Sequence, residues 1–500
     1  MTKDTDNHMP SLSRRGLILG SAGMLGAGLV PARAYAQGAA PVAAGAVPTG
    51  KDFILRGGMV VTMDPAIGDL LKGDVHVKDG AIVAIGPDLA APGAEIIDAD
   101  GMIVMPGLVE THWHMWNNLF KNLVKQGRGY VELKNGLGRF HEPEDFYNAV
   151  RLAMTEATNA GITTVMNYAH NTLTPAHVDA EIKAMVESGL RGRYAYGGAD
   201  PTPKDKTMDI ADALRANREW FSGNHEWTGR VDFGFSTRAP GGLPDVYAQE
   251  FKAAKDNGLP IIMHGGQSPA FKVPVVKLNQ EGFVDKSTIF VHSLLFTEED
   301  RAILAKTGAS NSMSLGNEFP HGQRNAGAAV RQQMLLQIKE GVNVCLSFDA
   351  SSLSRTSLFE QMRLCYAVLM GEAETPTAAI PRVTHTQCIE MATINGARAF
   401  GFADKCGTLS PGKRADIIML RASDLSMAPV GELHTTIVHA TDNANVDTVI
   451  VDGRFLKRGG KIISVDVEEV RRKAVESLYR VRKRSGAGDF APATDTMPRF

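Results

Sequence analysis

Gly101-Met-Ile-Val-Met-Pro-Gly-Leu-Val-Glu-Thr-His-Trp-His114 is an apolar stretch of strand type that ends in two histidines, His112 and His114. Side chains two positions apart on a strand point to the same face. The two imidazoles can therefore chelate one metal ion where a buried strand ends. Isolated His-x-His pairs occur by chance in many proteins, so the meaning of this pair depends on what stands at the ends of later strands.

The middle of the chain, residues 106–404, alternates short apolar strands with amphipathic helices. Eight strands are expected, with ends near His114, His170, Gly198, Ser236, His264, His292, Leu315 and Asp349. The helical patterns between them include Glu144–Asn159, Val178–Ser188, Pro244–Asn257, Glu298–Lys306 and Ala328–Glu340. Glycines that suit helix C-terminal caps follow at Gly161, Gly189, Gly258, Gly308 and Gly341. Eight β/α repeats predict an α/β fold, a (β/α)8 TIM barrel, with an open doubly wound sheet as the alternative.

Both flanks of this middle region have a β-rich pattern. Residues 51–105 hold short strands and an Asp79-Gly80 hairpin signal. Residues 405–465 return to the same pattern, with Gly407-Thr-Leu-Ser-Pro-Gly-Lys-Arg-Ala-Asp416 and a second Asp-Gly turn at Gly453. We expect one small β-sandwich domain built from both segments, followed by a C-terminal helix and tail over residues 466–500.

The N-terminus has the pattern of an export signal. Ser13-Arg14-Arg15-Gly16-Leu17-Ile18 is a twin-arginine pattern, and a Gly/Ala/Leu-rich segment leads from it to Ala34-Tyr35-Ala36, a small-x-small cleavage site. This predicts a signal peptide over residues 1–36, a linker over 37–50 and a soluble periplasmic protein delivered by the twin-arginine machinery. A permanent membrane anchor is the alternative, although the apolar segment is short for one.

Composition and charge indicate which kinds of binding partner to expect. The hydrophobic fraction of 44% suits a large core, and the formal net charge of −2 is nearly balanced. No basic patch with interleaved aromatic residues stands out, so nucleic acid is not expected as a partner. We expect a small-molecule substrate and a homo-oligomer. Buried free thiols, with disulfides as the alternative, are expected at Cys345, Cys365, Cys388 and Cys406.

The ends of the predicted barrel strands carry side chains that bind metals. His112 and His114 end the first strand, and later strands end in His264, His292 and Asp349. Active groups of such barrels gather at the C-terminal ends of the strands. Any one of these residues could be a satisfied barrel histidine or a capping aspartate. Together they provide the nitrogen and oxygen donors that zinc and similar divalent ions favour.

These motifs resemble the amidohydrolase superfamily, and within it the branch of cytosine and guanine deaminases and triazine hydrolases. The resemblance spans roughly residues 51–465. It implies that one metal ion, zinc or else iron, is held by four ligands, and that a fifth residue lies beside the hydrolytic water. The implied ligands are His112, His114, His264 and Asp349, and the residue beside the water is His292. Two-metal members carry a carboxylated lysine on strand four. Here Val231-Asp-Phe-Gly-Phe-Ser-Thr-Arg238 has no lysine, which favours a mononuclear site.

This sequence departs from the family pattern at the expected proton donor. Relatives often carry His-x-x-Glu after strand five, whereas this chain has His264-Gly-Gly-Gln267, and an amide does not act as a general acid. Glu318 is the candidate replacement, with a solvated loop carboxylate as the alternative. Candidate substrate-binding residues are Gln267, His170 and Trp113, although His170 could be structural and Trp113 could serve packing.

The predicted function is metal-assisted hydrolysis of a non-peptide carbon–nitrogen bond, of deaminase type. Asp349 would pass a proton from water to the leaving nitrogen, His292 would stabilise negative charge, and Glu318 would assist as a proton donor. Hydrolysis of a linear amide, carbamate or urea is the first alternative. The second is a periplasmic binding protein on a catalytically dead scaffold.

Overall fold

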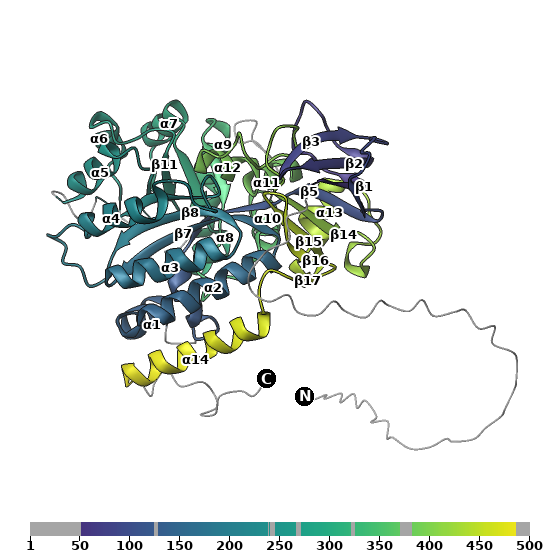
Figure 1. The fold of residues 1–500 in the computed structure, drawn as a ribbon. Coiled ribbons are helices and arrows are strands. Elements are labelled where there is room, and N and C mark those ends of the chain that lie inside the picture. Colours follow the sequence, from purple (N-terminus) through teal and green to yellow (C-terminus); the bar gives the residue numbers. More distant parts are fainter. Residues whose placement is uncertain are drawn as a thin grey trace, which may run out of the picture. The chain divides into compact units, whose positions relative to one another are not determined.

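The computed structural model describes residues 52–124, 129–238, 240, 246–266, 272–321, 326–370 and 383–486 (Figure 1). The predicted signal peptide, the linker and Gln267 lie outside these residues. None of the helices in the described part of the chain is both long and apolar enough to cross a membrane.

Eight parallel strands form one sheet in sequential order, each paired with the next along the chain. They are β6 (Leu108–Trp113), β7 (Ile162–Thr172), β8 (Arg191–Gly198), β9 (Val231–Thr237), β10 (Ile261–His264), β11 (Thr288–Val291), β12 (Ser310–Met313) and β13 (Asn343–Leu346). The first and last strands meet through a bridge between Trp113 and Asp349. There the N–H of His114 donates to the carbonyl of Asp349 at 2.8 Å, and the N–H of Asp349 donates to the carbonyl of His112 at 3.1 Å. This is the predicted (β/α)8 barrel, and the contact that closes it lies among the predicted metal ligands.

Helices follow the strands where the apolar periodicity predicted them. The barrel helices include α2 (Pro143–Asn159), α3 (Pro175–Glu187), α4 (Ile210–Phe221), α5 (Tyr247–Asp256), α6 (Val275–Gln280), α7 (Glu298–Thr307), α8 (Leu315–His321), α9 (Ala326–Lys339) and α10 (Leu358–Met370). Later helices are α11 (His385–Met391), α12 (Ile394–Phe400), α13 (Leu433–Ala440) and α14 (Val467–Ser485). All five predicted capping glycines have positive φ, between 65° at Gly258 and 80° at Gly189 and Gly341. At these angles a side chain is strained, which accounts for glycine there.

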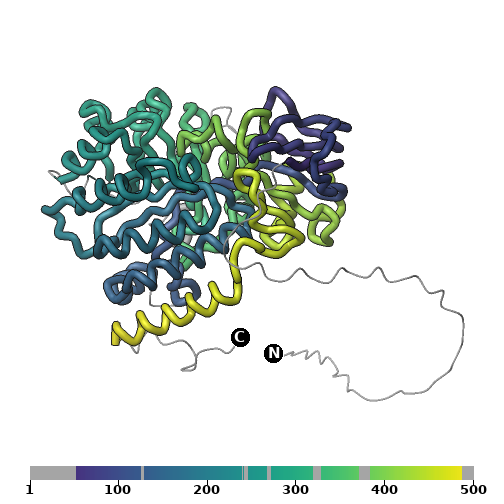
Figure 2. The backbone as a smooth tube through the Cα atoms, viewed as in Figure 1, coloured from purple at the N-terminus to yellow at the C-terminus, as the bar shows by residue number. Residues whose placement is uncertain are grey.

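A second, mixed sheet draws on both ends of the chain, as predicted. Its strands are β1 (Asp52–Val60), β2 (Leu70–Lys78), β3 (Ala81–Gly86), β4 (Glu95–Asp98), β5 (Met102–Pro106), β14 (Ile417–Arg421), β15 (Val446–Val451), β16 (Arg454–Arg458) and β17 (Lys461–Ile462). The join is the antiparallel pairing of β5 with β14, and Figure 2 shows these segments from opposite ends of the chain side by side. All nine strands belong to one hydrogen-bonded sheet, so the composite β domain is a single mixed sheet built from both segments.

A buried ion pair connects the two sheets. Arg191, the first residue of β8, donates from Nε to Oδ2 of Asp416 at 2.6 Å and from Nη2 to Oδ1 at 3.1 Å. Both side chains are 1% exposed. Oδ1 of Asp416 also accepts the backbone N–H of Asp452 at 2.8 Å. The last residue of the Gly407–Asp416 motif therefore anchors the second sheet to the barrel.

All four cysteines are buried and free, as expected for structural thiols. Burial raises the pKa of Cys345 and of Cys406 to about 12. Thiols with such pKa values stay protonated near neutral pH and are poor nucleophiles.

Candidate metal centre

Three imidazoles converge at the C-terminal end of the barrel. His112 and His114 leave β6 on the same face, with ring centroids 4.6 Å apart. His264, the last residue of β10, lies 5.0 Å from the ring of His112 and 5.4 Å from that of His114. One ring nitrogen of each histidine lies within 4.8 Å of the others, which is close enough for all three to hold one ion.

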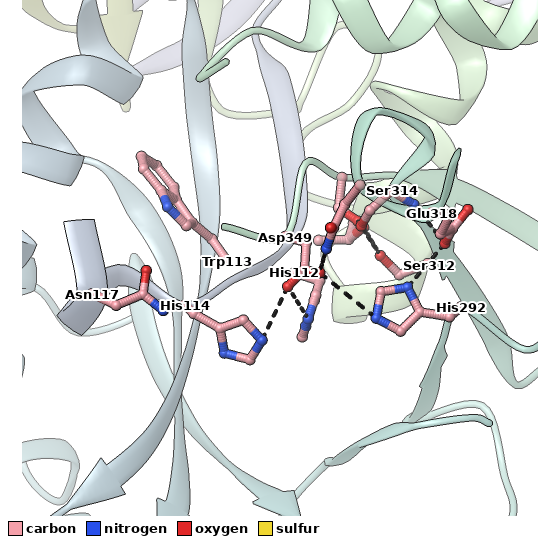
Figure 3. A network of polar contacts seen from close by, with 12 residues as sticks. His112, Trp113, His114, Asn117, His292, Ser312, Ser314, Glu318 and Asp349 are labelled. Carbon is pink, nitrogen blue, oxygen red and sulfur yellow. Dashed lines mark hydrogen bonds and ion pairs between the residues drawn. The ribbon is translucent and has the colours of Figure 1, made fainter. Parts of the chain in front are cut away.

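Asp349 faces these histidines from the end of the last strand. Its Oδ1 lies 3.2 Å from Nε2 of His112 and 3.0 Å from Nε2 of His114, and its Oδ2 lies 3.8 Å from Nε2 of His292 (Figure 3). The backbones of Asp349 and His292 have φ of 66° and 73°. Left-handed conformations of this kind strain residues other than glycine and cluster at functional sites, where the surrounding structure enforces them.

The protonation states suit a divalent cation. Burial lowers the pKa of His112 to about 3 and that of His264 well below its usual value, so both imidazoles are neutral. Burial also opposes ionisation of Asp349, but its contacts with His112 and His114 outweigh burial and hold the pKa of this carboxyl well below its usual range. Metal ligands must be deprotonated in this way.

Unpaired polar atoms are a second indication that these residues fit a divalent metal ion. Both ring nitrogens of His112 are buried and have no hydrogen-bond partner among the described residues, and the same holds for Nδ1 of His114. Buried polar atoms without partners are costly, because they lose water and gain nothing in return. A cation bound by His112, His114, His264 and Asp349 would give each imidazole a partner at one ring nitrogen, so the residues fit a mononuclear divalent site.

His292 connects this group to Glu318. Nδ1 of His292 lies 2.9 Å from Oε1 of Glu318, which also accepts the backbone N–H of Ser314 at 2.9 Å. Burial lowers the pKa of His292, but Glu318 and Asp349 outweigh this and raise it overall. Glu318 is 4% exposed and is therefore not a solvated loop carboxylate. It lies on the opposite side of the imidazole from Asp349, so it acts on the group through His292 (Figure 3).

Two of the candidate substrate-binding residues are described, and they are placed differently. His170 lies at the metal group, with its ring edge-on to His114 at 4.4 Å between centroids. Trp113 requires a correction. Because it alternates with His112 and His114 along β6, it points to the opposite face, is fully buried, packs on Phe348 at 4.7 Å and donates to Oγ of Ser351 at 3.0 Å. Its role is packing, and it does not reach the site.

Three residues at the site were not predicted from the sequence. Asn317 donates from Nδ2 to Oδ2 of Asp349. Tyr168 lies with its ring 4.7 Å from that of His264. Asp200 lies 2.9 Å from Nδ1 of His170. Only Tyr168 carried a readable signal, since it stands two residues before His170 on a strand and therefore shares its face.

Comparison with known proteins agrees with this geometry. The sequence matches the amidohydrolase family over residues 103–456. The 5'-deoxyadenosine deaminase of Methanosarcina mazei is 29% identical over 455 residues, which is 86% of this chain and 99% of that protein. The 5-methylthioadenosine/S-adenosylhomocysteine deaminase of Desulforudis audaxviator is also 29% identical, over 454 residues, with the same coverage of 86% and 99%.

Solved structures share the fold. A zinc-bound adenosine deaminase from Xanthomonas campestris superposes with a TM-score of 0.73 at 20% identity, over 87% of this chain and all of that one. A zinc complex of an atrazine chlorohydrolase from Arthrobacter aurescens TC1 has a TM-score of 0.71 at 18% identity, over 85% of this chain and all of the other. Because the family match spans well over half of the chain, the protein belongs to the amidohydrolase family and is a metal-dependent hydrolase that acts on carbon–nitrogen bonds.

Proposed function

We propose that this protein is a mononuclear zinc aminohydrolase that releases ammonia from a small-molecule amine. The observation that carries the proposal is the convergence of His112, His114 and His264 with the ionised Asp349 beside His292. Neutral nitrogen donors with one carboxylate are the ligands that zinc favours. The zinc-bound relatives named above support the choice of metal.

A zinc ion held by these four residues would supply Lewis-acid activation of water and substrate. The side chains provide the rest of the chemistry. Asp349, whose low pKa keeps it ionised, accepts the proton of the attacking water and passes it to the leaving nitrogen. Glu318 and Asp349 raise the pKa of His292 and so favour its protonated form, with hydrogen on both nitrogens. In this form the ring donates from Nδ1 to Glu318 and presents Nε2–H to negative charge that develops on oxygen.

The proposed substrate class is an aminated heteroaromatic compound, with purine nucleosides tested first. Relatives that act on 5'-deoxyadenosine and 5-methylthioadenosine support this order of testing. Gln267 stands where such hydrolases often carry glutamate, and we assign it substrate orientation rather than proton transfer.

We also infer that the protein is exported. Arg14-Arg15 and the Ala34-Tyr35-Ala36 cleavage site support passage through the twin-arginine machinery, followed by release into the periplasm as a soluble protein. That route carries folded proteins, which suits an enzyme loaded with its metal before export. A homo-oligomer remains our expectation for the mature protein.

The test is a turnover screen of zinc-loaded mature protein, residues 37–500, against amines, amides, carbamates and ureas. Ammonia release from an amine, absent in Asp349→Asn, supports the proposal. Turnover restricted to amides, carbamates or ureas would replace it with the first alternative. Binding without turnover of any compound, by protein that holds its metal, would identify a binding protein.

A further inference from the structure

A three-residue relay lies at the mouth of the barrel, next to the metal group and outside it. His170 is near the end of β7, and its Nδ1 lies 2.9 Å from Oδ1 of Asp200. The other carboxylate oxygen of Asp200 lies 3.0 Å from Nζ of Lys134. Lys134 belongs to α1 (Tyr130–Leu137), a helix in the connection that follows β6. The relay therefore joins that helix to the ring that lies edge-on to His114.

The direction of the hydrogen bond follows from the charge of Asp200. Burial opposes its ionisation, but His170 and Lys134 outweigh burial and hold the pKa of this carboxyl well below its usual range. A carboxylate only accepts hydrogen bonds. Nδ1 of His170 therefore carries the hydrogen, and Asp200 selects this tautomer in the way that carboxylate partners of imidazoles generally do.

The other nitrogen of the ring is left without a partner. Nε2 of His170 is buried and makes no hydrogen bond to any described residue. With its hydrogen on Nδ1, the neutral ring bears a lone pair on Nε2. A buried acceptor without a donor costs stability, and such atoms in binding sites commonly find their partner in the ligand.

We propose that His170 is a specificity-determining residue whose Nε2 accepts a hydrogen bond from an N–H or O–H group of the substrate other than the leaving amine. Asp200 and Lys134 are positioning residues that hold the ring in the accepting tautomer. The inference rests on the proposed function and narrows it to amines that carry a further N–H or O–H donor. A compound without that donor leaves Nε2 unpaired in the complex and is disfavoured, which is how buried polar groups discriminate between substrates.

The tautomer is tested first, without any substrate. In wild-type protein with ¹⁵N-labelled histidine, the His170 resonances, assigned by their loss in His170→Phe, should show hydrogen on Nδ1 and a bare Nε2. Asp200→Asn removes the obligate acceptor and should shift the ring toward the other tautomer. A wild-type ring with hydrogen on Nε2 would overturn the inference, whatever the enzyme hydrolyses.

Selectivity is tested next, with 5'-deoxyadenosine and its 2'- and 3'-O-methyl ethers as the first probes, and with the corresponding methylated analogues of any other amine found in the screen. Wild type should prefer a donor-bearing compound over one methylated analogue by about tenfold or more in kcat/KM. His170→Phe keeps a flat ring without the acceptor and should abolish this preference, mainly through KM. His170→Gln keeps an acceptor and should restore part of it.

Glu132→Gln is the matched control, because Glu132 lies on the same helix, is exposed, and accepts the backbone N–H of Gly129 at 3.1 Å. It should leave the preference unchanged. An unchanged preference in His170→Phe would refute the inference while the proposed function stands. Lack of amine turnover by metal-loaded wild type would instead refute the proposed function, and the ¹⁵N result would still report on the tautomer.

Discussion

Glu318 and His292 are held together at 2.9 Å, with the carboxylate on one side of the imidazole and Asp349 on the other. Glu318 cannot turn away freely, because the same oxygen also accepts the backbone N–H of Ser314. This contact holds the ring of His292 in one orientation and raises its pKa. Any effect of Glu318 on proton transfer at the site therefore acts through His292.

Glu318→Gln should lower kcat by ~10²–10⁴ while metal content stays near that of wild type. The amide keeps the size of the side chain but removes the negative charge that raises the pKa of His292, so the ring loses its protonated form more readily. The loss should be similar for good and poor leaving groups, because Glu318 acts by positioning. A loss confined to poor leaving groups would instead identify Glu318 as the direct proton donor.

The mature protein should contain about one divalent ion per chain. His112→Ala and His264→Ala should purify with most of the metal missing, since each removes a nitrogen donor from the group. His292→Ala should retain metal and lose activity. Elemental analysis together with circular dichroism checks all three variants. Two ions per chain in wild type, or metal-free His292→Ala of native fold, would contradict these assignments.

Glu181 on α3 should make stability depend on pH. Burial raises its pKa to about 8 from the ordinary 4.5, so the folded state binds a proton that the unfolded state releases between these values. Its contribution is complete below the unfolded pKa and is lost as pH rises through the folded pKa. Between about pH 5 and about pH 9, the wild-type free energy of unfolding should fall by an amount on the order of a few kcal/mol because of this group. Glu181→Gln should not show that fall.

Urea unfolding at the two pH values measures this difference. Glu187→Gln on the same helix, where the side chain is 48% exposed, is the control and should keep the wild-type pH dependence. If Glu181→Gln loses stability with pH as steeply as wild type does, another group carries the effect.

Asp416→Asn should destabilise the protein by about 3 kcal/mol, because it leaves the charge of Arg191 buried and only partly compensated. Asp452, 3.5 Å from Arg191, keeps the cost near the lower end of the usual range. Asp256→Asn removes an ion pair between two exposed side chains, Lys252 at 70% and Asp256 at 58% exposure. It should cost less than about 1 kcal/mol of stability. Chemical unfolding of both variants provides the comparison, and equal losses would argue against the anchoring role of Asp416.

Arg14→Lys combined with Arg15→Lys should hold the protein in the cytoplasm, because the twin-arginine signal is read by a receptor. Cell fractionation with a periplasmic marker measures the distribution. Recovery of the double variant from the periplasm at the wild-type level would refute the export signal.

Much of the fold was readable because periodicity and turn chemistry are local. Asp79-Gly80 forms the hairpin turn that it predicted, with φ of 50° and 76°. Strand ends were readable for the same reason, and they brought His264 and Asp349 to the rim beside the His-x-His pair. The sequence showed only that the segments containing β5 and β14 are both β-rich. Their pairing and register could not be predicted, because register depends on contacts between segments far apart in the chain.

The direction in which each side chain points was harder to predict. Strand alternation already sets Trp113 on the opposite face from His112 and His114, and the structure adds the partner on which it packs, Phe348. Asp200 lies in a loop where no periodicity applies, and its contact with His170 depends on how that loop returns over the barrel. The left-handed backbone at Asp349 also has no sequence signal, because residues other than glycine take it only where tertiary packing enforces it.

The pairing of β5 with β14 has a consequence for the order of synthesis. A chain growing on the ribosome completes β1 to β5 early, but β14 is made only after the entire barrel. Until then β5 has an unpaired edge, and such edges invite pairing with other chains. Nascent or C-terminally truncated chains should therefore aggregate through this edge. A route that accepts only folded cargo would withhold export until the last strands have been made and paired.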